Sequence, residues 1–555
     1  MSNVFNRVGG LRPRRNKFDL SYRKNFTCNI GQIIPVFCDE VVPGDYFKIG
    51  NQLTVRFQPL AAPIMHELSA SVHYFFVPYR ILWNQWTDFI EGPTGKNPEP
   101  AVPSLPRFEP SVSNNLYVYF GTLWDYFGMP LSPAIPNNNN TNRTAPIAFP
   151  WYAYNMVWNE YFRDVDLQDE LPLGNNAVQM RNYKKDYFTA SRPFQQRGTP
   201  PALPGNVQAI FTPYLGNEDG NIVRLGFPRS DSSIPWDQDN AYFRLANPQT
   251  AQPTATSGNT EAFRVNPTGA TYSSELQFSI NNIAPKLYNK TSFTTTSFNV
   301  SDLRLAVQYQ KWLERNARTG SLRHTHFLQA HFGVSPSDAR LQRPEYIGGT
   351  KMPLIISEVL QTSESSNTAQ GTMTGHGLGA DSQFAGTYNA QEYGIIIGVM
   401  SVMPKPAYQN GINRQWLRRN PTDFYFPEFA HLSEQGVENG EILFLPDGGD
   451  GSYNQRAIFG FVGQYDEMRV KHDMVCSEMR VNVPPSQASL SYWNMSRNFQ
   501  SQVYLNSQFI RCDSADFSRC FLVPDRNQLI VNCQNIVHAV RPLPLIAEPG
   551  MMDHF

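Results

Sequence analysis

The chain has 555 residues and a formal net charge of -1, which excludes a polyanion-binding role for the chain as a whole. Charged residues make up 17%, below the roughly 25% of ordinary soluble domains. Aromatic residues make up 13% and there are 43 prolines, so the composition indicates a large, loop-rich protein with a surface suited to interfaces.

The first 25 residues differ from the rest in charge. They contain a Gly9-Gly10 break and a single acidic residue, Asp19. We predict a basic N-terminal arm over residues 1–25, for which a disordered tail is the plain alternative. Its basic residues are Arg7, Arg12, Arg14, Arg15, Lys17, Arg23 and Lys24.

Residues 26–90 contain the clearest strand patterns. Apolar residues alternate with polar ones over 52–58 and again over 68–76, which predicts half-buried antiparallel strands. Residues 79–90 are expected to be helical. Residues 151–162 predict an aromatic helix whose rings pack in the core rather than bind a ligand.

Residues 205–290 are rich in Pro, Ser, Thr and Asn, and we expect a surface insertion there. A lateral clamp between subunits is the alternative. The segment carries too many aromatic side chains for a disordered linker. They are Phe211, Tyr214, Phe227, Trp236, Tyr242, Phe243 and Phe263.

A helix is predicted over residues 301–318, with Ser301 as its cap. One face is apolar, and the opposite face carries basic residues that include Arg304, Lys311 and Arg315. A short apolar strand follows over 354–359.

Beyond this strand, we expect a Ser/Thr/Gly loop over 361–392 and a strand buried on both faces over 394–403. Further strands are expected over 457–462 and from Leu529 onward. Many strands and few helices favour an all-β fold, an antiparallel β-sandwich of the jelly-roll type with long loop insertions.

The search for chemistry finds no complete catalytic set. His324, His326 and His331 lack an acidic or cysteine co-ligand, so packing is preferred to metal binding. Residues 375–379 lack the context of a phosphate loop, and residues 447–451 miss the calcium-loop spacing, so a flexible loop and a turn are expected. We therefore predict no enzyme activity, no metal and no cofactor.

The remaining features of the sequence indicate in which cell compartment the protein is made. The six cysteines form no C-x-x-C pair, the N-terminus has no signal-peptide pattern, and no apolar run is long enough to cross a bilayer. We expect synthesis in a reducing cytoplasm and no membrane span.

Several segments resemble one known family. They are Pro43-Gly-Asp-Tyr46, Lys185-Asp-Tyr-Phe-Thr189, His331-Phe-Gly-Val-Ser-Pro336, and Glu345-Tyr-Ile-Gly-Gly349, with further matches to residue 544. Together they resemble the major capsid protein of gokushoviruses, small single-stranded DNA phages of the Microviridae. Asp338 stands one position later than in the family pattern, and Ile347 replaces a leucine. The segment 205–290 matches least.

The resemblance implies a jelly-roll protein that self-assembles into a simple icosahedral (T=1) shell around a circular single-stranded DNA genome. It implies virion localisation after assembly in the bacterial cytoplasm. The implied partners are further copies of the chain, the DNA, a small basic DNA-binding protein, other virion proteins and a host surface receptor. The insertion would project at the threefold axes for host attachment.

These implications divide the chain into the arm 1–25 and a capsid domain 26–555, interrupted by 205–290. We expect the seven basic residues of the arm, with Arg304, Lys311 and Arg315, to face DNA. The seven aromatic residues of the insertion are expected to serve receptor contact. A lectin-like receptor-binding module and a jelly-roll carbohydrate-active enzyme are the alternatives, and neither would self-assemble.

Overall fold

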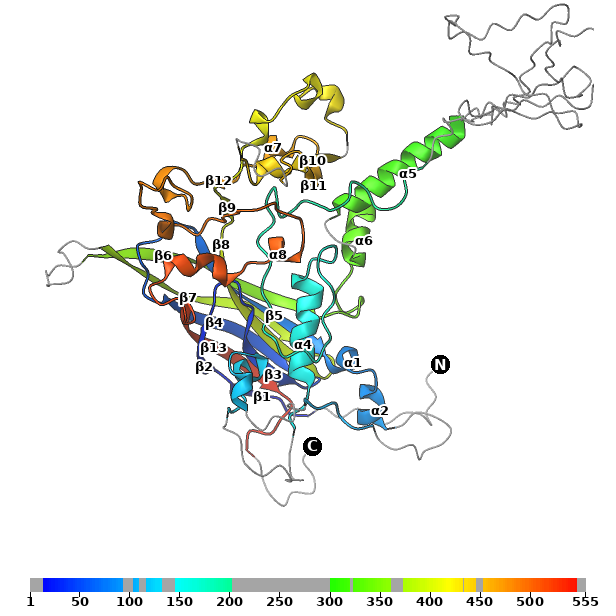
Figure 1. Ribbon diagram of the computed structural model, residues 1–555. Helices are drawn as coiled ribbons and strands as arrows, with labels where there is room; N and C mark the ends of the chain where they lie inside the picture. Colours follow the sequence, from blue (N-terminus) through cyan, green and yellow to red (C-terminus); the bar gives the residue numbers. More distant parts are fainter. Residues whose placement is uncertain are drawn as a thin grey trace, which may run out of the picture. The chain divides into compact units, whose positions relative to one another are not determined.

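The computed structural model describes residues 13–92, 103–108, 116–131, 145–201, 300–319, 323–360, 373–432, 434–445 and 453–546 (Figure 1). The chain forms two units, Met1–Pro200 with Gln310–Phe555, and Pro201–Tyr309. The insertion 205–290 with its seven aromatic residues, the segment 447–451, Arg7 and Arg12 lie outside the described residues.

The first unit contains one nine-stranded antiparallel sheet, which curls into two halves with the connectivity of a jelly roll. We call the halves its two sheets: one has the order β2–β13–β4–β7 and the other β3–β8–β5–β6. They are joined by β6, which pairs with β5 through its first part and with β7 through its last. This interleaving confirms the predicted all-β fold. The strands are β1 (Asn16–Asp19), β2 (Tyr22–Cys28), β3 (Ile34–Val41), β4 (Tyr46–Phe57), β5 (Leu68–Pro78), β6 (Glu345–Leu360), β7 (Met373–Asn389), β8 (Gly394–Pro404) and β13 (Leu529–Arg541).

The main core lies between the two sheets. The inward residues of β4, such as Leu53 and Val55, are buried while the residues between them are exposed or half-buried, so the predicted alternation is confirmed there. The half-buried prediction is wrong for β5, because its second face also packs: Phe75 and Val77 join a separate cluster with a helix. The prediction that 394–403 is buried on both faces is confirmed in β8.

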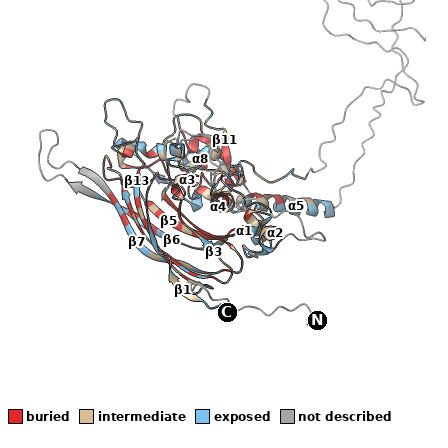
Figure 2. Cartoon of the chain, turned by 90° about the horizontal axis from the view of Figure 1, so that it is seen from below, coloured by how far each residue is buried: buried red, intermediate tan, exposed pale blue. Residues whose placement is uncertain are grey.

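The helices gather on one side of the curled sheet (Figure 2). The aromatic helix is α4 (Phe149–Val157), extended by a π-helical turn, and its Trp151 is fully buried, which confirms core packing. Residues 79–90 form two helices instead of the one predicted, because Trp83 is extended and ends the first. The other helices of this side are α1 (Tyr79–Leu82), α2 (Trp86–Glu91) and α3 (Leu123–Tyr126).

The Ser/Thr/Gly loop predicted over 361–392 is wrong for residues 373–389, which form β7, while residues 361–372 lie outside the described part of the chain. Residues 378–389 of β7 pair with β4, and residues 373–378 pair with β6. The glycines of β7 leave room for neighbouring side chains against its backbone. A Cβ on Gly377, for example, would stand 2.1 Å from the ring of Phe57. Residues 375–379 are therefore part of a sheet and not a flexible loop.

The predicted helix at 301–318 is confirmed as α5 (Val300–Arg318), and α6 (His324–Phe332) follows. Of the apolar face of α5, Leu313 is buried whereas Leu305 is 71% exposed. α6 ends where Gly333 adopts a left-handed conformation with φ 69°, which favours glycine.

Two of the segments that resemble the capsid family contain aspartates that stabilise tight loops. At 43–46, the Asp45 carboxylate accepts a hydrogen bond from the amide of Val42, and the guanidinium of Arg541 lies 3.4 Å from it. At 338–346, the Asp338 carboxylate accepts hydrogen bonds from Arg343 and from the amide of Tyr346. Each aspartate thus fixes a loop at the end of a strand.

The remaining described chain packs around a third apolar cluster that includes Phe188, Val437 and Phe509. The six cysteines form no disulfide. No described helix is long and apolar enough to cross a membrane. The elements here are β9 (Ala407–Tyr408), β10 (Glu434–Glu438), β11 (Ile458–Gly463), β12 (Asp473–Met474), α7 (Asp466–Arg469) and α8 (Ser507–Ile510).

Candidate nucleic-acid interface

The outward face of the β2–β13–β4–β7 sheet is exposed, and we call it the open sheet face. Its residues alternate with the buried core residues along each strand. The register sets them in rows across the strands. One row is Arg23, Gln534, Gln52 and Ser382.

Four basic side chains lie on the open sheet face, all of them exposed: Lys17, Arg23, Lys48 and Arg56. Among the described side chains, the one acidic group beside them is Asp19 of β1, which is paired with His538 of β13. Hydrogen bonds from Ser21 lower the pKa of Asp19, so it is charged at neutral pH. The face is therefore net positive, although the whole chain is close to neutral.

Aromatic rings lie among these cations. Tyr46 and Phe384 are 42% and 57% exposed, and the ammonium of Lys48 lies 5.5 Å from the ring centroid of Phe384. Basic groups that bind phosphates and exposed rings that stack on bases are the two components of single-stranded nucleic-acid sites.

The described part of the predicted arm contributes directly to this face. β1 and β2 both pair with β13, so residues 16–28 are built into the sheet. Arg14 and Arg15 are exposed just before β1.

The expectation that every basic residue of the arm faces DNA is wrong for Lys24. Its side chain points to the inner side of β2, where the ammonium donates hydrogen bonds to the carbonyl oxygens of Pro35 and Tyr126. Burial lowers the pKa of Lys24 to about 8. Lys24 is therefore not available to a phosphate.

The other predicted basic residues lie on α5 and are exposed: Arg304, Lys311 and Arg315. No described contact connects them to the strands of the open sheet face. The three histidines His324, His326 and His331, for which packing was preferred to metal binding, lie on α6. The His331 imidazole is hydrogen-bonded to Asn316 at 2.7 Å. Among the described residues no group of three or more His, Cys, Asp or Glu is arranged to hold a metal.

Lys48 and Arg56 were not predicted from the sequence. The sequence does contain a signal for them, because Lys48, Gln52 and Arg56 recur every fourth residue and therefore share one face of a strand.

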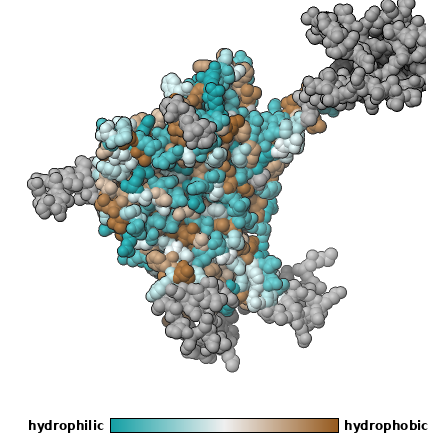
Figure 3. Space-filling view, in the orientation of Figure 1, coloured by the Kyte–Doolittle hydropathy of each residue, from teal (hydrophilic) through white to brown (hydrophobic). Residues whose placement is uncertain are grey.

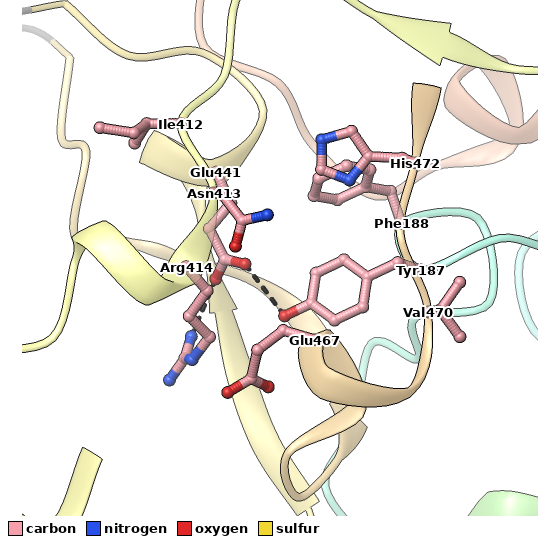
Figure 4. Close-up of a pocket in the computed structure, with 9 residues that line it drawn as sticks. All are labelled: Tyr187, Phe188, Ile412, Asn413, Arg414, Glu441, Glu467, Val470 and His472. Carbon is pink, nitrogen blue, oxygen red and sulfur yellow. Dashed lines mark hydrogen bonds and ion pairs between the residues drawn. The ribbon is translucent and has the colours of Figure 1, made fainter. Parts of the chain in front are cut away.

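A second cluster of polar side chains lies beside β10, and its role is structural (Figure 4). The phenol of Tyr187 donates to Glu441 at 2.9 Å, and Arg414 donates to its other carboxylate oxygen at 2.8 Å. Burial raises the pKa of Glu441, and Arg414 opposes that shift. The space between the residues is about 10 Å³, which has no room for a substrate.

The comparisons with known proteins agree with one another. Residues 6–551 match the family described as "Capsid protein (F protein)". The chain belongs to the F-protein family of phage capsid proteins. Capsid protein VP1 of Chlamydia phage 1 is 30% identical over 99% of this chain and 98% of its own length. Capsid protein VP1 of Spiroplasma virus 4 is 29% identical, and that of Bdellovibrio phage phiMH2K 26%, over similar shares.

The family assignment confirms the resemblance to gokushovirus capsid proteins and the structural role. This capsid protein is a component of a virion shell and not an enzyme. The lectin-like module and the carbohydrate-active enzyme have no support. The open sheet face is therefore a surface of a shell subunit.

Proposed function

We propose that this capsid protein assembles into a closed icosahedral T=1 shell around circular single-stranded DNA, with the open sheet face turned toward the genome. The observation that carries the proposal is the set of four exposed basic side chains, Lys17, Arg23, Lys48 and Arg56, on one regular surface with exposed rings among them. A shell subunit has one surface that meets the packaged polyanion, and basic groups on that surface release counterions on binding.

In this proposal, Arg7 and Arg12 of the arm also contact the DNA, and so do Arg304, Lys311 and Arg315 of α5. Since the chain carries a net charge of -1, it cannot neutralise a genome alone, and a small basic DNA-binding protein supplies the remaining positive charge. Assembly, with the other virion proteins, takes place in the bacterial cytoplasm.

A double substitution tests the DNA-facing surface. Lys48→Gln with Arg56→Gln should weaken binding of a single-stranded oligodeoxynucleotide to purified protein, measured as a function of salt. Each lost phosphate contact reduces the slope of log K against log salt by about 0.7, so a reduction of roughly 1.4 is expected.

The matched control is Lys471→Gln with Arg456→Gln, which removes one exposed lysine and one exposed arginine away from this sheet. It should leave the slope unchanged. Equal slopes for both double variants would refute the assignment of the open sheet face to DNA.

We also propose that the insertion 205–290 projects outward and contacts a host surface receptor through its aromatic residues. The support is its Pro-, Ser-, Thr- and Asn-rich composition combined with seven large rings. Replacing it with a short Gly/Ser linker should give particles that assemble but do not adsorb to host cells. Normal adsorption would refute the receptor role, and loss of assembly would favour a clamp between subunits.

A further inference from the structure

A large cleft lies on the outer face of the other sheet, beside α4. Its volume is about 980 Å³, and its floor is formed by outward residues of β5 such as Ser69, Ser71 and His73. The neighbouring part of the same sheet face is apolar and covered by α4. The change from isoleucine and valine to serine along one face marks where packing ends and a solvent-filled site begins.

The central residue of the cleft is Arg181. Its guanidinium donates to the hydroxyl oxygens of Ser71 and Ser401, each at 2.6 Å, and lies over the ring of Phe162 at 5.5 Å. Burial lowers the pKa of Arg181, and no carboxylate is among the groups that influence it. A desolvated guanidinium held only by neutral groups has its charge free for an anion.

The cleft as a whole is strongly basic. Eight arginine or lysine side chains line it, with two aspartates. Both aspartates already have internal partners: Asp164 pairs with Lys185 and Arg192, and Asp338 pairs with Arg343. Four further cations form no ion pair within the described chain, namely Arg163, Arg181, Lys184 and Lys351.

Neutral hydrogen-bonding groups stand beside these cations. The Tyr346 hydroxyl lies 3.2 Å from the His73 imidazole, whose pKa is lowered to about 4 by burial and by the charge of Arg181. His73 is therefore neutral at pH 7. Phe75 packs between Tyr161 and Tyr346, with centroid distances of 4.7 and 5.3 Å, so these rings already contact one another.

We propose that this cleft binds a phosphorylated sugar, with the phosphate on Arg181 and the sugar hydroxyls on the serine, tyrosine and histidine groups. Rings packed together offer little flat surface for stacked bases, which disfavours nucleic acid. The outward direction of the cleft rests on the proposed function: if the open sheet face meets DNA, the opposite sheet faces the outside.

Hydrophilic residues cover much of the molecular face drawn in Figure 3, with hydrophobic residues in separate patches.

The test measures binding of a hexose phosphate, inorganic phosphate and the unphosphorylated hexose to the purified full-length protein by calorimetry. The hexose phosphate should bind best and the unphosphorylated hexose should not bind measurably. Arg181→Gln keeps a hydrogen-bond donor for the serines, and it should weaken hexose phosphate binding about tenfold or more, since a charge-assisted contact is lost.

Two further variants protect the test against misfolding and nonspecific charge effects. Lys184→Gln with Lys351→Gln alters two exposed side chains and should weaken binding several-fold without affecting the fold. Arg526→Gln, an exposed arginine elsewhere, should bind like the wild type. Unchanged binding in both the Arg181 and the double lysine variants would overturn the proposal.

A third comparison separates the cleft from the DNA surface. The Lys48→Gln, Arg56→Gln variant should bind the hexose phosphate normally, whatever it does to DNA binding. If a short oligodeoxynucleotide binds in an Arg181-dependent manner and more tightly than the hexose phosphate, the sugar assignment is wrong and the cleft is a nucleic-acid site.

Discussion

At the scale of single residues, the direction of a side chain decides its role more than its charge does. Arg23 and Lys24 are neighbours in β2, yet Arg23 is exposed on the open sheet face and Lys24 donates to buried carbonyl oxygens. Alternation along a strand separates them. A basic segment therefore supplies both surface charge and an internal hydrogen-bond donor.

Lys24 gives a prediction about pH. Its pKa is about 8 in the folded protein, lowered mainly by burial, and near 10.4 when unfolded. Between these values the unfolded chain binds more protons, so the contribution of Lys24 to the free energy of unfolding should rise with pH from about 8 to about 10. The thiols of Cys38 and Cys533 have pKa values raised to about 12 by burial but about 8.5 when unfolded, so they oppose this rise, and the Lys24 contribution is measured as a difference between variants.

Denaturant unfolding of the reduced protein at several pH values measures this effect. The free energy of unfolding of the wild type minus that of Lys24→Met should increase over this range, whereas the same difference for Lys17→Met, at an exposed position of β1, should stay constant. A Lys24→Met difference that does not change with pH would contradict the prediction.

At the scale of elements, β7 depends on glycine for its place in the sheet. Gly377→Ala would put a methyl group against the Phe57 ring and should reduce the free energy of unfolding by about 1–3 kcal/mol. Gly174→Ala is the control, because the nearest atom to its new methyl group would be 3.9 Å away. Equal stability of the two variants in thermal unfolding would contradict this packing account.

The same strand shows what the sequence could and could not predict. β8 and α4 were predictable because apolar residues on every buried face leave a direct pattern. β7 was not, since its polar outer face and inner glycines resemble a loop, and its place depends on Phe57, more than 300 positions earlier in the chain. The cleft was also unpredictable, because Ser71, Arg181 and Ser401 meet only through the sheet and the loops beside it.

At the scale of the whole molecule, the sandwich carries two basic surfaces on opposite sheets. The open sheet face is regular and carries exposed aromatic rings, whereas the cleft is concave and carries Arg181 among hydroxyl groups. A near-neutral chain thus concentrates positive charge at two places. We propose that in a closed shell the open sheet face meets the interior and the cleft the exterior.

An electron cryo-microscopy reconstruction of purified DNA-containing particles tests this arrangement most directly. We expect a closed icosahedral shell in which Lys17, Arg23, Lys48 and Arg56 line the inner surface against DNA density, while the cleft around Arg181 opens outward. A reconstruction with the open sheet face on the exterior, or with no nucleic-acid density against it, would contradict this arrangement.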